Sequence, residues 1–289
     1  MRFRLLPITI FAFLLISYVQ SFAQESDLSN PLEEGKKGGV ILIGPCAGYN
    51  RSLHSLSLSS FNNDVYCPVF KKGDGSGFFF GLTYELPFGK ADQSTTSLIF
   101  RAVYSTMPFH MTEAGDDVPS LVVLTKDDQG YNPKDPNQQI INSKVQHTMD
   151  ISYNIVSIEA MYKYNIDVST PIGFTAGPTI DIPITRTLQQ KMKIIESSVP
   201  VQFIPQPGYK YADGGTTLLV QDGAIKNASS LGIGLKIGVH YEYQLQTGAY
   251  SSATLMPYIY YKLGLLKVTS SEDWRINMLQ IGFDLRFGM

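Results

Sequence analysis

The stretch SLGIGLKIGVHYEYQL, residues 230–245, constrains the fold more than any other part of the chain. Eight consecutive odd-numbered residues, from Leu231 to Leu245, are apolar, and the even-numbered residues between them are Gly, Lys, His, Glu and Gln. Because side chains alternate between the two faces of a strand, this pattern predicts a β-strand with one apolar face. Globular strands cluster near about five or six residues, whereas a strand that crosses a bilayer at a tilt needs about 9 to 11. The length therefore favours a membrane-spanning strand.

The same alternation recurs in seven further segments. Together the predicted strands are 40–51, 77–88, 97–107, 147–166, 174–188, 230–245, 253–265 and 274–287. Within 147–166 the apolar set changes parity between Ile155 and Val156, which indicates either a bulge or an extension beyond the membrane.

The intervals between these segments alternate in length. Long intervals at 52–76, 108–146 and 189–229 are rich in Gly, Pro, Asp, Asn, Ser and Lys, and short ones separate the others. Short turns on one rim and long loops on the other are typical of bacterial outer-membrane barrels. We therefore predict an antiparallel up-and-down transmembrane β-barrel of eight strands, with long extracellular loops and short periplasmic turns. Strand-like pieces at 199–204 and 216–221 leave ten strands as the alternative.

Alternation alone does not say which face is inside. A secreted lipocalin-like barrel has the same pattern with the apolar face inward. Eight long faces of Leu, Ile, Phe and Tyr would overfill the interior of a small barrel, whereas glycines and paired charges fit a narrow lumen. We therefore expect lipid outside, with aromatic side chains such as Tyr49, Phe78 and Trp274 at the loop rim.

The N-terminus resembles an export signal. Two arginines precede an apolar stretch, and Ser21 and Ala23 stand at the small-residue positions of a cleavage site. We expect a signal peptide over 1–23, a short periplasmic segment over 24–37 and the barrel over 38–289, with an uncleaved anchor as the alternative. The chain carries 23 basic and 25 acidic residues, and so lacks the basic excess that nucleic-acid binding requires.

Few residues of this chain suggest chemistry. Cys46 and Cys67 leave two interpretations open, a disulfide in an exported protein or a buried thiol beside an unrelated loop cysteine. Two cysteines and four scattered histidines give no metal-ligand spacing, so we expect no metal and no cofactor. His110, Glu113 and Ser120 are close in sequence and suggest a hydrolase, but their spacing matches no catalytic motif, so we expect no enzyme.

The C-terminal residues QIGFDLRF, 280–287, resemble the β-signal of outer-membrane proteins: a polar residue, then glycine, an apolar residue and an aromatic residue at fixed spacing. Gln280, Gly282, Leu285 and Phe287 match that pattern. The chain thus resembles the family of small OmpA-, OmpX- and PorT-like outer-membrane barrels. The resemblance implies a place in the bacterial outer membrane, with its lipids, periplasmic chaperones and the barrel-assembly machinery as partners, and it implies no single activity.

Charged residues lie among the polar positions of the predicted strands. They are Glu85, Arg101, Glu159, Lys163, Asp181, Lys236, His240, Glu242, Lys262, Asp284 and Arg286. We expect them to pair across a narrow lumen and plug it, because a wide aqueous pore needs about 16 strands. The predicted function is structural or surface interaction, with an extracellular ligand bound through the loops. The alternatives are a narrow channel for ions or small solutes, an outer-membrane hydrolase and a secreted lipid carrier.

Overall fold

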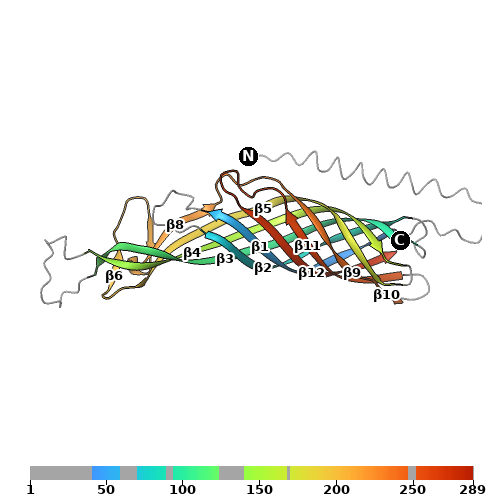
Figure 1. Cartoon of the computed structure of the whole chain (residues 1–289), viewed down its shortest axis with the longest axis horizontal. Helices are drawn as coiled ribbons and strands as arrows, with labels where there is room; N and C mark the ends of the chain where they lie inside the picture. Colours follow the sequence, from blue (N-terminus) through green and yellow to red (C-terminus); the bar gives the residue numbers. More distant parts are fainter. Residues whose placement is uncertain are drawn as a thin grey trace, which may run out of the picture.

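The computed structural model describes residues 41–58, 70–88, 94–123, 140–167, 170–246 and 252–288. The chain forms one antiparallel sheet of twelve strands (Figure 1). They are β1 (Leu42–Leu58), β2 (Phe70–Pro87), β3 (Thr96–Val122), β4 (Ile140–Asn165), β5 (Ile172–Glu196), β6 (Val201–Phe203), β7 (Lys210–Ala212), β8 (Thr217–Ala224), β9 (Gly232–Tyr241), β10 (Tyr243–Gln246), β11 (Ser252–Gly264) and β12 (Arg275–Gly288). The prediction of an all-β antiparallel fold is confirmed. The expected signal peptide and periplasmic segment lie outside the described residues.

The pairings close the sheet into a ring. β1 pairs with both β2 and β12, and the ladder continues from β2 through β3 and β4 to β5. β9 then joins β5 to β11, and β11 pairs with β12. β10 follows β9 along the edge of β11. Among the described residues no helix has the length and apolarity needed to cross a membrane.

Three strands continue far beyond the others at one end of the ring (Figure 1). β3, β4 and β5 have 27, 26 and 25 residues, and the short strands β6 and β8 pair with β3 and β5 there. We call this part, β3 from 111, β4 up to 148 and β5 from 189 with β6, β7 and β8, the extension. The predicted loops over 108–146 and 189–229 are therefore wrong in part, because much of each is strand.

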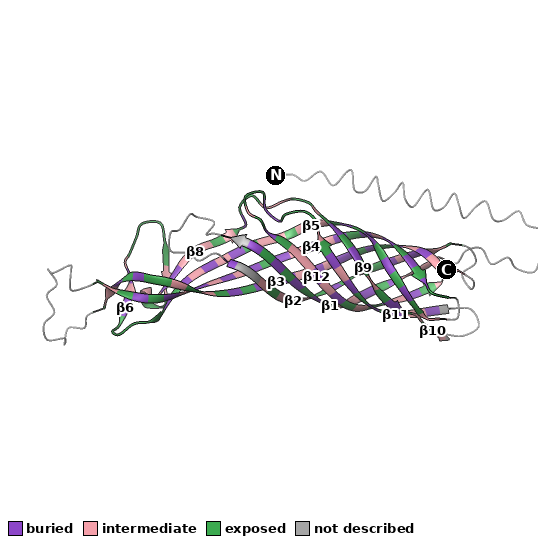
Figure 2. Ribbon diagram, viewed as in Figure 1, coloured by how far each residue is buried: buried purple, intermediate pink, exposed green. Residues whose placement is uncertain are grey.

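The polarity of the two faces inverts along β4, and this explains the error. Odd-numbered residues face inward throughout the described part of β4 (Figure 2). Near the extension the inward residues are apolar or aromatic, as at Ile151 and Tyr153, and Ser152 between them is exposed. Further along, Glu159 is buried and Ile158 is 47% exposed. The parity change at Ile155 thus marks a change of surroundings, not a change of face.

A bulge does lie at this point, but in β5. Ile155 is opposite Pro183 while Asn154 is opposite Thr185, so Ile184 is the extra residue. The inward set of β5 accordingly changes from odd positions such as Thr179 to even positions from Leu188 onward. An extra residue in one strand shifts every later side chain to the other face.

Apolar side chains fill the interior toward the extension. The largest cluster consists of Leu56, Phe70, Met107, Phe109, Met111, Met149, Ile151, Tyr153, Ile155, Leu188, Ile225, Val268, Trp274 and Met278. A second, within the extension, consists of Val118, Val145, Met192, Ile194, Val201, Phe203, Leu218 and Val220. Trp274 is fully buried here, so its expected place in an aromatic girdle is wrong: its ring completes the core.

The opposite end of the ring carries an outward apolar band. Its exposed members include Tyr49, Phe78, Phe80, Leu82, Phe100, Ile158, Tyr162, Tyr164, Phe174, Ile180, Ile182, Ile184, Leu231, Ile233, Leu235, Ile237, Val239, Tyr241, Ile259, Leu263, Leu266, Ile281, Phe283 and Phe287. Every strand of the ring contributes to this band. It ends toward the extension where Arg51 and Asp74 form an exposed ion pair on the outer face.

Candidate functional site

The charged residues predicted for the lumen all lie on the inner side of the ring, behind the apolar band. All are buried except Asp181 and Glu242, which are half-buried. They form three groups of contacts, which we call the upper pair, the central group and the rim group.

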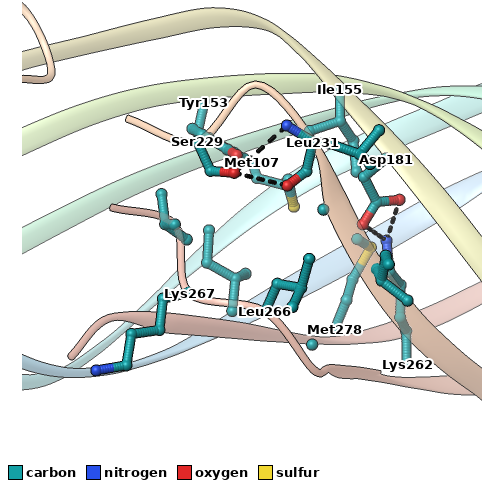
Figure 3. Close-up of a pocket in the computed structure, with 15 residues that line it drawn as sticks. Met107, Tyr153, Ile155, Asp181, Ser229, Leu231, Lys262, Leu266, Lys267 and Met278 are labelled. Carbon is teal, nitrogen blue, oxygen red and sulfur yellow. Dashed lines mark hydrogen bonds and ion pairs between the residues drawn. The ribbon is translucent and has the colours of Figure 1, made fainter. Parts of the chain in front are cut away.

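The upper pair lies nearest the apolar core (Figure 3). Lys262 Nζ is 2.5 Å from each carboxylate oxygen of Asp181. Ser157 Oγ donates a further hydrogen bond of 2.7 Å to Asp181 Oδ1. Both partners of the ion pair thus have the contacts that a charge removed from water requires.

The central group links four strands across the ring. Arg101 Nη2 lies 2.6 Å from Asp284 Oδ1, and Arg101 Nη1 lies 3.7 Å from Glu159 Oε2. Lys236 Nζ pairs with Glu159 Oε1. The Arg101 guanidinium also lies 4.5 Å from the ring centroid of Tyr258, a cation–π distance. All four charged side chains are at most 1% exposed.

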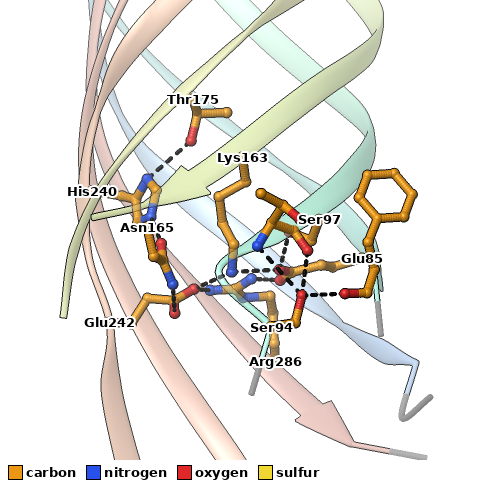
Figure 4. A network of polar contacts seen from close by, with 11 residues as sticks. Glu85, Ser94, Ser97, Lys163, Asn165, Thr175, His240, Glu242 and Arg286 are labelled. Atoms are coloured by element: carbon orange, nitrogen blue, oxygen red, sulfur yellow. Dashed lines mark hydrogen bonds and ion pairs between the residues drawn. The ribbon is translucent and has the colours of Figure 1, made fainter. Parts of the chain in front are cut away.

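The rim group lies at the end of the ring that is remote from the extension (Figure 4). Lys163 Nζ is 2.5 Å from both Glu85 Oε1 and Glu242 Oε1. Arg286 pairs with Glu85 and, at 2.9 Å, with Glu242 Oε1. Two cations and two carboxylates therefore alternate in a closed circuit that ties β2, β4 and β12 to the residue between β9 and β10.

Both ring nitrogens of His240 are hydrogen-bonded beside the rim group (Figure 4). Its Nε2 is 2.8 Å from Asn165 Oδ1, and its Nδ1 is 2.9 Å from Thr175 Oγ1. Because an amide oxygen only accepts, Nε2 donates to Asn165, whereas the threonine hydroxyl can either donate to Nδ1 or accept from it. Asn165 Nδ2 then donates to Glu242 Oε2 over 2.9 Å, which fixes the amide orientation.

The three groups are electrically balanced. The cations are Arg101, Lys163, Lys236, Lys262 and Arg286, and the carboxylates are Glu85, Glu159, Asp181, Glu242 and Asp284. Every member touches at least one partner of opposite sign. Sequence alternation indicates which of these side chains face inward, but it does not give their partners, because partners come from strands far apart in the chain.

The apolar core also contains a buried polar side chain, that of His54. His54 is stacked on Phe109 with ring centroids 4.0 Å apart, and Trp274 Nε1 donates to His54 Nδ1 over 3.1 Å. Burial among these rings lowers the pKa of His54 to about 3, because the charged imidazolium would lose its water. No local sequence pattern predicts this contact, since His54 and Trp274 are 220 positions apart.

The residues of the C-terminal pattern all lie in β12. Gln280 is buried and Phe287 is 42% exposed, so the polar and aromatic members face opposite sides. Gly282 is required by its neighbours: a Cβ there would lie 2.5 Å from the carbonyl oxygen of Ala47 and 2.5 Å from Phe79 Cζ.

The hydrolase candidates are not brought together. His110 is exposed and its Nδ1 lies 2.6 Å from Asp150 Oδ1 on the outer surface. Ser120, ten residues further along β3, is buried and donates to the carbonyl of Val118. At about 3.3 Å per residue the two side chains are roughly 33 Å apart. Within the described ranges no cluster of three or more His, Cys, Asp or Glu residues could hold a metal ion.

Cys46 is a free, buried thiol, which does not agree with a disulfide. Cys67 itself lies outside the described residues.

Comparisons with known proteins give only remote similarity. No family model matches the chain, and no curated protein matches it. Among solved structures, Neisserial surface protein A is similar at 12% identity and a TM-score of 0.33, over 87% of this chain and 100% of that one. Ail, the attachment invasion locus protein of Yersinia pestis, is similar at 10% identity and a TM-score of 0.33, over 85% and 97%. The same protein in complex with the heparin analogue sucrose octasulfate gives 8% identity and a TM-score of 0.31, over 85% and 98%.

Proposed function

We propose that this chain is an integral protein of the bacterial outer membrane, whose eight-stranded ring spans the bilayer. The observation that carries the proposal is the inverted polarity of the ring. Ile237 is 44% exposed on the outer face, while its neighbour Lys236 is 1% exposed inside. In water such an arrangement would expose a continuous apolar belt and bury ion pairs, whereas in a bilayer the belt contacts hydrocarbon.

The same inversion defines which parts leave the membrane. Toward the extension, polar residues such as Ser152 face outward and apolar residues such as Ile151 face inward, as in a water-soluble β-protein. We place the extension outside the cell, because the long connections of outer-membrane barrels are extracellular. The rim group then lies at the periplasmic end, and the barrel-assembly machinery would recognise Gln280, Gly282, Leu285 and Phe287 after periplasmic chaperones deliver the chain.

We propose that the three charge groups close the lumen and stabilise the ring. Each group joins strands that are not adjacent in sequence, as Arg101 on β3 joins Asp284 on β12. A closed interior supports a structural or surface-interaction role, in which the extension presents the binding surface. Exposed apolar side chains on it, including Ile140 at 46% and Ile195 at 52%, would contact an extracellular ligand.

The proposal is tested by cell fractionation combined with gel mobility before and after boiling. We expect the chain in the outer-membrane fraction, with a band that shifts on heating because a folded barrel stays compact in cold detergent. Recovery of a monodisperse chain from the periplasm or medium without detergent would instead identify a secreted carrier.

Conductance in planar bilayers separates the closed barrel from the narrow channel. We expect no discrete conductance steps from the purified wild-type chain. The narrow channel would be established instead by discrete conductance steps whose size changes in Lys163→Met, which opens the rim group. The same steps should not change when the exposed residue Lys144 is substituted.

A further inference from the structure

A hydroxyl, an imidazole and a carboxylate are linked on the outer face of the sheet. His110 and Thr112 lie two positions apart on β3, so both face outward, and Asp150 is opposite His110 on β4. His110 Nδ1 is 2.6 Å from Asp150 Oδ1, and His110 Nε2 is 3.2 Å from Thr112 Oγ1. Both distances fall within the reach of about 2.6–3.2 Å that joins a nucleophile, its base and the group that orients the base.

The order of these contacts suits general base catalysis. The Asp150 carboxylate only accepts, so His110 Nδ1 carries a proton and donates it. In the neutral form of the imidazole, Nε2 therefore has the free lone pair and accepts from the Thr112 hydroxyl. A carboxylate, an imidazole and a hydroxyl in this order activate the hydroxyl oxygen for acyl transfer.

This group of three side chains is open to the solvent. The side chains of His110 and Asp150 are 62% and 48% exposed, and Thr112 is exposed as well. His240 also contacts a threonine hydroxyl, but its partner Thr175 is 2% exposed inside the ring. Of these two histidines, only His110 can therefore meet a substrate.

The group lies just beyond the apolar band. Asp74, opposite His110 on β2, forms the exposed ion pair with Arg51 at which the band ends. Phe78, which is 56% exposed and belongs to the band, follows Asp74 along β2 after roughly 13 Å of strand. An ester whose acyl chain contacts the band is thus brought toward Thr112, and Arg51 is on the same face to contact an anionic headgroup.

We propose that Thr112, His110 and Asp150 hydrolyse carboxylic esters of lipids at the membrane surface. Thr112 Oγ attacks the ester carbonyl carbon while its proton passes to His110 Nε2. The bond from that carbon to the alcohol oxygen breaks, and the alcohol leaves with the proton from Nε2. Water then attacks the acyl-threonine ester and gives a proton to Nε2, which returns it to Thr112 Oγ as the carboxylic acid leaves. Asp150 is a positioning residue that orients the imidazole.

A second threonine completes the site. Thr148 lies directly opposite Thr112 on β4, where cross-strand Cβ atoms are about 4.5–5.5 Å apart. Its hydroxyl is placed to donate to the oxyanion that forms on the ester carbonyl. Ser120 has no part in this site, because it is buried. The choice of a lipid ester rests on the proposed place in the membrane, whereas the contacts among Thr112, His110 and Asp150 do not.

The first measurement uses a soluble ester, p-nitrophenyl butyrate, with the full chain folded in detergent micelles. We expect hydrolysis by the wild type and by Thr112→Ser, and a loss of at least about 100-fold in Thr112→Val and His110→Gln. Ser152→Ala is the matched control, because this exposed hydroxyl of β4 lies outside the site, and it should hydrolyse the ester at the wild-type rate. The heat-dependent gel shift of each sample shows that the variant is folded.

A fluorophosphonate probe identifies the nucleophile directly. Its phosphorus bonds to Thr112 Oγ as fluoride leaves and the hydroxyl proton passes to His110. We expect mass spectrometry to find the adduct on Thr112 in the wild type and no adduct in Thr112→Val. Asp150→Ala should slow this labelling, and Asp150→Asn should recover part of the rate, because an amide oxygen still accepts from His110 Nδ1.

The second measurement replaces the soluble ester with vesicles of phosphatidylcholine that contain the inserted chain. We expect release of fatty acid and lysophosphatidylcholine by the wild type and none by Thr112→Val. Hydrolysis of the soluble ester alone by the inserted chain would overturn the lipid substrate. A chain that hydrolyses the soluble ester but does not float with the vesicles would overturn the membrane location, so the two failures are distinguishable.

Three results would overturn the activity itself. One is a folded wild-type chain that neither hydrolyses an ester nor takes up the fluorophosphonate. Another is an equal rate in the wild type and Thr112→Val. The third is an adduct on a residue other than Thr112.

Discussion

Removing one carboxylate from the central group tests whether the interior excludes water. In Glu159→Gln, Lys236 loses its paired carboxylate, while Arg101 keeps Asp284 at 2.6 Å. Lys236 is 1% exposed, so its charge would stay buried without a partner. Breaking a buried pair in this way costs about 3–5 kcal/mol. We expect the free energy of unfolding to fall by that amount.

The matched control is the double variant Glu159→Gln with Lys236→Met. It removes both charges and keeps a side chain of similar length in place of the lysine. Replacing a buried pair by apolar groups is often neutral or stabilising, so we expect the double variant to recover most of the loss. The assay is urea unfolding of the refolded protein in phospholipid vesicles, followed by the fluorescence of Trp274.

A water-filled lumen gives a different magnitude. Solvated ion pairs contribute about 0–1 kcal/mol. A loss below about 1 kcal/mol in Glu159→Gln, with no recovery in the double variant, would therefore refute the closed interior and favour the narrow channel.

Three further outcomes follow from the same structure. The pKa of His54 is about 3 in the folded chain, below its ordinary value of about 6.5. Between these two values the unfolded state binds a proton that the folded state does not, so the contribution of His54 to the free energy of unfolding is full above about pH 6.5 and falls as the pH drops toward 3. Urea unfolding of His54→Gln at several pH values should lack this dependence. Ile237→Arg on the apolar band should cost about 2–4 kcal/mol in vesicles, whereas Ile195→Arg on the extension should cost little, and equal costs would contradict the placement of the bilayer. Asp74→Asn, at an ion pair with both side chains about half exposed, should change the unfolding free energy by less than about 1 kcal/mol.

The sequence predicts well the half of this fold that carries the outward apolar band. Along β9, the odd residues from Ile233 onward face outward and Lys236 faces inward, as alternation requires. The prediction succeeds there because, at the proposed place in the membrane, one solvent, hydrocarbon, surrounds the whole outer face. Each strand then keeps its apolar residues on one parity, and period-two alternation is sufficient to identify it.

The extension was missed because the two faces of the strands exchange polarity there. On β3 the outward apolar residue Phe100 is followed by outward polar ones such as His110, while the inward side changes from Arg101 to Phe109. A search for one apolar face ends where the two faces exchange character, although the strand continues. The extra residue Ile184 and the contact of Trp274 with His54 depend on tertiary pairing, which no local pattern records.

The central claim is that the bilayer ends where the faces of β4 exchange polarity. Its most direct test attaches a spin label at single cysteines at the even positions 150–164 of β4, in a background without the two native cysteines, and measures collisions with oxygen and with a water-soluble nickel complex in vesicles. We predict that labels at 158, 160, 162 and 164 respond to oxygen and labels at 150 and 152 respond to nickel, with the change between 154 and 156. Preferential access of nickel at all of these positions would contradict the account.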